Sequence, residues 1–308
     1  MNRLNIQSFR AALRALTVAF AGLAGLFSAP LAAQDAPASA PAAAAAPTTG
    51  AANINITPRR VIFGPNKRTE AVYVFNQGNA AVTVDVALVD NVMLPTGEIV
   101  PVARAAEKGP EAEAAAATVK SARPYLLAAP SRLVLGPGQG KTIRVRATQP
   151  EGAGGAEYRS HLTVTTVPAA DSGLTAEQAA AAQRGELVLR IQSIFGLSIP
   201  LIVRDGAASA QATLGPITSS IAKGTPELLV PIRRSGTGSV YGNIEVRSGK
   251  NEVVGLVRGL AVYPEVTDRI AGVPLLRALR KGETVTVSYF AEDQKPGTAM
   301  ASGSFTAF

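Results

Sequence analysis

Apolar and polar residues alternate with a period of two along much of this 308-residue chain. Val82, Val84, Val86 and Leu88 alternate with Thr83, Asp85, Ala87 and Val89, and the same spacing recurs at 72–75, 143–147, 162–165 and 285–289. A period of two places successive side chains on opposite faces of a β-strand. Because the runs are short and separated by glycine and proline, they predict an all-β sandwich or barrel.

Two glycine-containing segments lie between predicted strands. Asn76-Gln77-Gly78-Asn79 supplies residues that tolerate positive φ, and it predicts a tight hairpin. Gly136–Thr142 ends in Gly-Lys-Thr, like a phosphate-binding loop. The position that requires the first glycine is Leu135, however, and an alternating strand follows instead of a helix. We therefore interpret this segment as a second hairpin turn.

The N-terminal 33 residues have the layout of a secretory signal peptide. Arg3, Arg10 and Arg14 precede an apolar run from Ala15 to Phe27, and small residues follow as far as Ala33. The run is shorter than the ~20 residues that a membrane span requires, although a membrane anchor is the alternative. Residues 34–52 are rich in Ala and Pro and predict a disordered leader. We therefore expect an exported protein without membrane insertion of its mature part.

The remaining sequence predicts two β-sandwich domains, at 53–204 and 205–308. A long apolar segment, 187–203, ends the first domain; as one strand it would run ~50 Å, and we expect it to bend near Pro200. Arg204-Asp205-Gly206 marks the boundary. The inserts 105–122 and 168–186 predict surface loops or short helices.

The composition argues against an enzyme. The chain has no cysteine and a single histidine, His161, which we interpret as a solvent-facing strand residue. It has no Gly-x-Ser-x-Gly motif. Its acidic residues are dispersed, for example Glu70, Asp85, Asp90, Glu157, Glu245 and Asp268. We therefore expect no catalytic set, no metal site and no cofactor.

Nucleic acid is not an expected partner. The formal net charge is +8, and three of the positive charges lie in the predicted signal peptide. The other basic residues are scattered, with no long basic run and no basic stripe rich in aromatic residues.

Arg60 and the 187–203 segment are the features left for a binding function. Arg60 is either a structural arginine or a bidentate anchor for a carboxylate. The 187–203 segment is either an ordinary core strand or an edge strand that extends the sheet of a partner. Its polar members, Arg190, Gln192, Ser193 and Ser198, indicate that it is not buried on every side.

Several segments, in order, resemble those of the PapD-like periplasmic pilus chaperones, which have two immunoglobulin-like domains. The segments are Ile56-Thr-Pro-Arg-Arg-Val-Ile-Phe63, Val72-Tyr-Val-Phe-Asn76, Pro130–Arg146, Glu157-Tyr-Arg-Ser-His-Leu162 and Leu187–Arg204. The resemblance implies that the last strand of the first domain is donated to a pilin-type subunit, which the chaperone delivers to an outer-membrane usher.

The resemblance also implies site residues. Arg60 would anchor the carboxylate of the subunit, but the family's second anchor, a lysine, falls on Pro200, so Arg190 is a possible secondary cation. The donor row would be Leu187, Leu189, Ile191, Ser193 and Phe195; a slip of one residue would replace it with Val188, Arg190, Gln192 and Ile194. The alternative is an exported structural or adhesive two-domain protein without a donor strand. An exported hydrolase is a third, disfavoured possibility.

Overall fold

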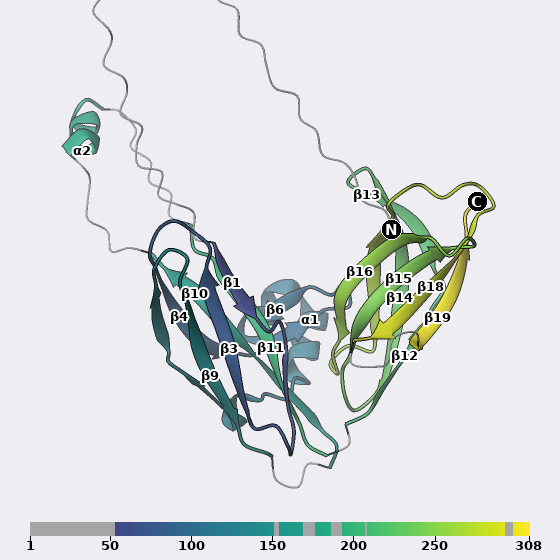
Figure 1. The fold of residues 1–308 in the computed structure, drawn as a ribbon, viewed down its shortest axis with the longest axis horizontal. Helices are drawn as coiled ribbons and strands as arrows, with labels where there is room; N and C mark the ends of the chain where they lie inside the picture. Colours follow the sequence, from purple (N-terminus) through teal and green to yellow (C-terminus); the bar gives the residue numbers. More distant parts are fainter. Residues whose placement is uncertain (1–52, 151–153, 169–175, 186–192, 207, 293–297) are drawn as a thin grey trace, which may run out of the picture. The chain divides into compact units, whose positions relative to one another are not determined.

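The computed structural model describes residues 53–150, 154–168, 176–185, 193–206, 208–292 and 298–308 (Figure 1). The described residues form an all-β protein with two sandwiches, as the period-two pattern predicts. The predicted signal peptide and leader lie outside the described residues.

The first sandwich packs two sheets around one core. One sheet has the order β1 (Ile54–Thr57), β3 (Thr69–Asn76), β9 (Gly140–Ala147), β7 (Leu126–Ala129). The other has the order β2 (Val61–Phe63), β11 (Gly196–Arg204), β10 (Glu157–Val167), β4 (Val82–Val89), β8 (Arg132–Leu135). The inward residues of both sheets, such as Phe63, Val72, Ile143 and Leu162, are fully buried.

Both glycine-containing turns connect the two sheets, so the prediction of hairpins was wrong. β3 and β4 belong to different sheets, and so do β8 and β9. The Asn76 side chain lies where the two crossings meet. Its amide nitrogen donates to the carbonyl oxygens of Ala80 (2.8 Å), Leu135 (3.2 Å) and Gly136 (3.1 Å). A turn sequence gives local backbone conformation but not the partner of the next strand, which is why sequence reasoning failed here.

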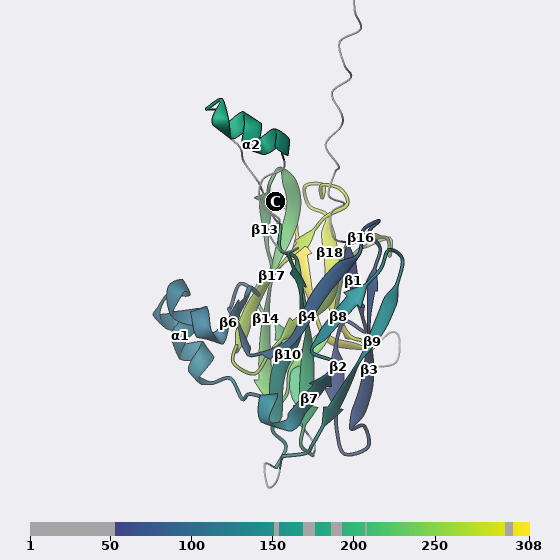
Figure 2. The ribbon, with the colours of Figure 1, turned by 90° about the vertical axis from the view of Figure 1, so that its left-hand side faces the viewer.

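The insert at 105–122 folds into a small satellite of the first sandwich. Residues on either side of the insert belong to this satellite too. It comprises the strands β5 (Asn91–Met93) and β6 (Ile99–Pro101), the 3₁₀ helices η1 (Val102–Lys108) and η2 (Arg123–Tyr125), and the helix α1 (Pro110–Ala117). Val92, Val100 and three buried alanines form its core. Figure 2 shows α1 and β6 projecting from the sheets. Of the two predicted forms, loop or short helix, the structure has the helix; in the second insert it has α2 (Ala176–Gln183).

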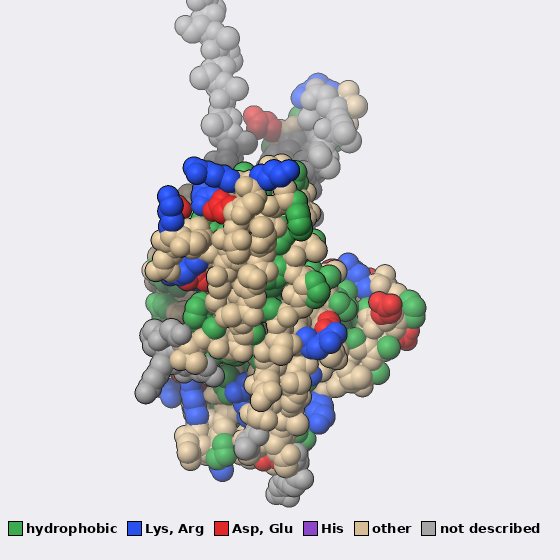
Figure 3. Space-filling view, turned by 90° about the vertical axis from the view of Figure 1, so that its right-hand side faces the viewer, with side chains coloured by type: hydrophobic (Ala, Val, Ile, Leu, Met, Phe, Trp, Pro, Cys, Tyr) green, Lys and Arg blue, Asp and Glu red, His purple; other side chains and the backbone are tan. Residues whose placement is uncertain are grey.

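The second sandwich also has two sheets. One contains β12 (Ala210–Leu214), β14 (Thr225–Gly236) and β13 (Thr218–Ala222), with β17 (Asp268–Pro274) also paired to β14. The other has the order β16 (Val253–Val262), β15 (Val240–Ser248), β18 (Thr284–Ala291), β19 (Ala299–Thr306). Cross-strand hydroxyl pairs, Thr284–Thr306 and Ser288–Ser302, line the outer side of β18 and β19. Uncharged atoms predominate in the space-filling view from that side (Figure 3).

His161 is buried, so the prediction of a solvent-facing residue was wrong. It is 3% exposed, and its ring meets that of Tyr263 edge-on at 6.5 Å between centroids. Burial, with a smaller contribution from the positive charge of Arg159, lowers the pKa of His161 from 6.5 to about 3. The period of two assigns His161 to the outer face of its sheet, as the structure has it. Tyr263 of the second sandwich covers that face, however, so water does not reach the ring.

Buried ionic groups join β10 to the second sandwich. The Arg159 guanidinium donates to both carboxylate oxygens of Glu265, at 3.0 and 2.5 Å, and both side chains are 3% exposed. Arg159 also lies 3.7 Å from the ring centroid of Tyr263 and donates to the Asn91 carbonyl oxygen. Glu157 accepts hydrogen bonds from the Ser239 backbone and hydroxyl. Because each charge has a partner, this burial is compatible with a stable fold.

No described helix is long and apolar enough to cross a membrane. Among the described residues, no group of three or more His, Cys, Asp or Glu side chains converges as a metal site would require.

Candidate functional site

The edge of β11 is open over the first half of the strand. β10 pairs with all of β11, from Gly196 to Arg204. On the other side, β2 pairs in parallel only from Leu201 to Val203. Gly196–Pro200 therefore has no strand on that side among the described residues. An open edge of this kind can accept an added strand through its backbone groups.

Large apolar side chains lie exposed just before this edge. Ile194 is 62% exposed and Phe195 is 43% exposed. Phe195 is held in line with β11, because its N–H donates to the Thr166 hydroxyl at 2.9 Å and its carbonyl accepts from the Thr166 N–H at 2.8 Å. Exposed apolar residues beside an open strand edge indicate an interaction surface. Ser193 is exposed too, whereas Leu187, Leu189, Arg190 and Ile191 lie outside the described residues.

Pro200 lies within β11 and does not interrupt its pairing with β10. The register between β10 and β11 is continuous from Gly196 to Arg204, with Pro200 opposite His161. Pro200 has no N–H, and it lies one residue before the pairing with β2 begins. A missing donor is tolerated at such an unpaired position. The pairing therefore continues through Pro200, and the bend near this residue stays a prediction.

A cavity of about 570 Å³ adjoins the open edge of β11. Leu197, Ser198, Ile199 and Pro200 line one part of it. Its other lining residues come from β1 and the segment that follows, from the β5–β6 hairpin and from the second sandwich: Ile54, Asn55, Ile56, Arg59, Met93, Gly97, Ile99, Tyr241, Arg258, Gly259, Ala261, Tyr263 and Arg269. None of these described lining residues is acidic, while three are arginines.

Two of the three arginines are available to a ligand. Arg59 and Arg258 are exposed, and neither has an acidic partner among the described residues. Arg269 instead donates to the Ala261 carbonyl oxygen, and burial lowers its pKa. A carboxylate entering the cavity would meet two free guanidinium groups with bidentate geometry.

Arg60, the predicted anchor, lies next to this cavity but is already engaged. Its guanidinium carbon lies 3.6 Å from the ring centroid of Tyr241, and its Nη2 lies 3.7 Å from a carboxylate oxygen of Glu292. Its side chain is only 13% exposed. These contacts fit the structural alternative for Arg60 better than that of a free anchor. Sequence reasoning missed Arg258, because nothing in its local pattern connects it to a strand more than 50 residues earlier.

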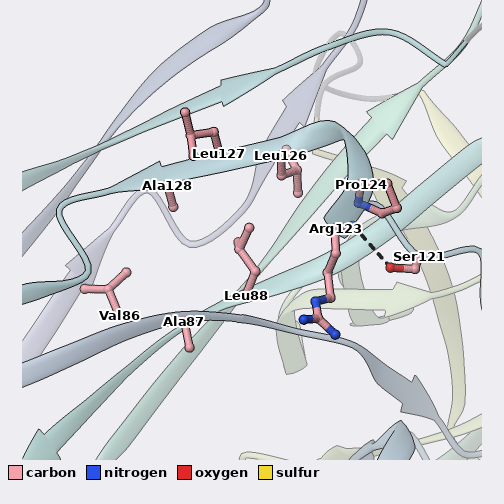
Figure 4. Close-up of a pocket in the computed structure, with 9 residues that line it drawn as sticks. All are labelled: Val86, Ala87, Leu88, Ser121, Arg123, Pro124, Leu126, Leu127 and Ala128. Atoms are coloured by element: carbon pink, nitrogen blue, oxygen red, sulfur yellow. Dashed lines mark hydrogen bonds between the residues drawn. The ribbon is translucent and has the colours of Figure 1, made fainter.

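A second, apolar groove lies at the opposite edge of the same sheet. β8 pairs with β4 only from Val82 to Asp85, so the edge of β4 from Ala87 to Val89 has no neighbouring strand among the described residues. The groove has a volume of about 710 Å³. Figure 4 shows Leu88 and Leu126 on its opposite walls, with Arg123 at one end. Leu127 on β7 also lines it and is 67% exposed.

The chain is similar to several solved chaperones. The E. coli chaperone DraB is 12% identical, with 83% of this chain and 96% of that chain covered and a TM-score of 0.39. The Pseudomonas aeruginosa CupB2 chaperone is 12% identical, with 82% of this chain and 100% of that chain covered and a TM-score of 0.40. In a complex of the Salmonella enterica SafA pilin with the SafB chaperone, the matched chain is 13% identical, with 82% of this chain and 96% of that chain covered and a TM-score of 0.40.

No protein-family model matches the sequence, and no curated protein matches it at a significant level. At such low identities and TM-scores the likeness carries no conclusion about activity. The function is therefore inferred from the chain's own residues.

Proposed function

We propose that this protein is a periplasmic chaperone that binds pilin-type subunits by adding its own strand to their sheet. The observation that carries the proposal is the open edge Gly196–Pro200, which follows the exposed Ile194 and Phe195 and adjoins an arginine-lined cavity. Backbone hydrogen bonds along the edge would provide affinity, and the apolar side chains before it would provide specificity. The donor row Leu187, Leu189, Ile191, Ser193 and Phe195 remains part of this proposal.

The cavity would hold a carboxylate of the bound segment. Arg59 and Arg258 are its free cations, and Pro200 forms part of its apolar wall. We assign the anchor to these two arginines, with Arg60 shaping the site through Tyr241. Arg258 thereby takes the part that the resemblance gives to a lysine and that Pro200 cannot perform. Binding by this mechanism uses no cofactor and no nucleotide.

Delivery to an outer-membrane usher requires a surface that remains free while a subunit is bound. The groove between β4 and β7 lies at the other edge of the sheet from β11. Its apolar walls and open β4 edge suit an extended apolar segment of another protein. We include the usher in the proposal on this basis.

The test is co-expression of the protein with a candidate pilin subunit, followed by co-purification. Phe195→Asp should abolish the complex, because it places a charge on the apolar row. Ile221→Asp is the matched control, since Ile221 is 74% exposed on β13 of the second sandwich. If Phe195→Asp and Ile221→Asp recover the subunit equally well, strand addition at this edge is wrong.

The anchor is tested separately with a synthetic peptide that matches the C-terminus of the subunit. Arg59→Ala combined with Arg258→Ala should weaken binding of the free-acid peptide and leave the amidated peptide unchanged. The control is Arg280→Ala combined with Lys281→Ala, which removes the same charge from an exposed pair in the second sandwich. Equal effects of the two double variants would contradict a local anchor.

The alternative is a structural or adhesive sandwich protein without donor activity. The engagement of Arg60 by Tyr241 and Glu292 favours it, because a dedicated anchor would be expected to be free. Under this alternative, no candidate subunit would co-purify with the native sequence.

A further inference from the structure

The outer face of the β1–β3–β9–β7 sheet carries cations and aromatic rings together. The outward side chains include Arg144 and Arg146 on β9, Ala71, Tyr73 and Phe75 on β3, and Leu127 on β7. We call these six residues the basic face. The register brings them together, since Arg144 lies opposite Ala71 and Arg146 lies opposite Leu127. Figures 1 and 2 show β3 and β9 side by side in this sheet.

The charge of this face is not neutralised. Arg144 and Arg146 are exposed and have no acidic partner among the described residues. Every outward position of the four strands holds an uncharged or basic residue. Elsewhere in this sandwich, exposed Arg132 pairs with Asp85 across neighbouring strands at 2.6 Å. Glu70, the carboxylate on β3, occupies an inward position and pairs with Lys67. Two unpaired arginines on a sheet face whose outward positions carry no carboxylate form a local positive field.

The aromatic part of the face includes a hollow. The rings of Tyr73 and Phe75 stack with centroids 6.3 Å apart, and Tyr73 is 41% exposed. A cavity of about 370 Å³ adjoins them, and its lining includes Arg59 and Gln77. The hollow therefore offers a guanidinium and an amide beside two rings, which suits a phosphate-bearing group with an apolar attachment.

We propose that the basic face docks on a lipid surface that carries anionic phosphate headgroups. Arg144 and Arg146 bind phosphate oxygens, for which the guanidinium fork is suited. Tyr73, Phe75 and Leu127 lie at the headgroup level, where aromatic and apolar side chains gain from partial burial. Charge alone would be enough to bind an acidic protein or a soluble polyanion. The exposed apolar groups beside the arginines therefore favour a lipid surface. The proposal rests on Arg144 and Arg146, which take no part in the proposed subunit site, whereas Arg59 borders both sites.

The first test is sedimentation with vesicles of phosphatidylcholine, with and without phosphatidylglycerol, at low salt. The native chain should bind only the anionic vesicles. Arg144→Gln with Arg146→Gln should lower the partition coefficient about 30-fold, which corresponds to about 1 kcal/mol for each basic residue near an anionic surface. Arg280→Gln with Lys281→Gln is the matched control, and it should bind like the native chain.

A second measurement locates the contact, because the chain contains no tryptophan. Ala71→Trp places a single fluorophore in the basic face, and Thr286→Trp places one on the hydroxyl-lined side of the second sandwich. Anionic vesicles should shift only the Ala71→Trp emission to the blue. All variants share the same N-terminal segment, so a difference between them arises from the exchanged residues.

Three outcomes would overturn the proposal. The first is an equal loss of binding in the two double variants, which would indicate attraction by net charge alone. The second is an unshifted Ala71→Trp emission on bound vesicles. The third is that the native chain binds heparin but not vesicles, and that the heparin binding is lost when Arg144 and Arg146 are changed. The partner would then be a soluble polyanion.

Discussion

Removal of Glu265 should be among the most destabilising single changes in the described part of the chain. Glu265→Ala leaves the Arg159 guanidinium, 3% exposed, without its counter-charge. It also removes the acceptor of the Met93 N–H, which donates to a Glu265 carboxylate oxygen at 2.8 Å. Breaking a buried ion pair on one side costs about 3–5 kcal/mol, because the remaining charge stays desolvated. The orphaned Met93 N–H places the expected loss in the upper part of that range.

The assay is urea unfolding followed by circular dichroism at pH 7, with the free energy of each transition obtained by linear extrapolation. Glu107→Ala is the control, because its partner Arg104 and Glu107 itself are 67% and 58% exposed. That variant should unfold like the native chain. Replacing both Arg159 and Glu265 by methionine should recover part of the loss, since no charge is then left unpaired. If Glu265→Ala and Glu107→Ala unfold alike, the buried pair does not contribute as argued.

Three further predictions concern stability. The folded protein holds His161 neutral to about pH 3, while the unfolded chain takes up a proton below about pH 6.5, so stability should fall with pH across that window. The loss in the free energy of unfolding should reach about 2 kcal/mol at pH 5 and be absent in His161→Gln. Urea unfolding of both proteins at pH 7 and pH 5 checks this, and an equal loss in the native chain and the variant would contradict it. Asn76→Ala leaves three carbonyl oxygens without their shared donor and should cost about 1–3 kcal/mol in the same assay, whereas Asn79→Ala should not. Gly242→Ala should lower the melting temperature strongly, because its Cβ would lie 1.9 Å from the Phe290 carbonyl oxygen; Gly249→Ala, with open space around it, is the control, and equal melting temperatures would refute the clash.

The candidate site could be predicted in part. The patterns singled out the Leu187–Val203 segment and Arg60 as candidates, and Phe195 lies exposed beside an open strand edge. The free cations, Arg59 and Arg258, were not identified as a pair. Arg258 belongs to β16 of the second sandwich, and only the packing of this strand next to Pro200 brings it to the cavity.

The sequence by itself determined that this protein is built from short strands, since a period of two fixes which side chains share a face. It also located the glycine and asparagine residues at which those strands turn. The tertiary structure decided which sheet each strand joins, because the turns at Asn76 and Gly136 are compatible with either a hairpin or a crossing. It also decided that His161 is buried, since the alternation assigns a residue to a face but does not say whether water or Tyr263 covers that face.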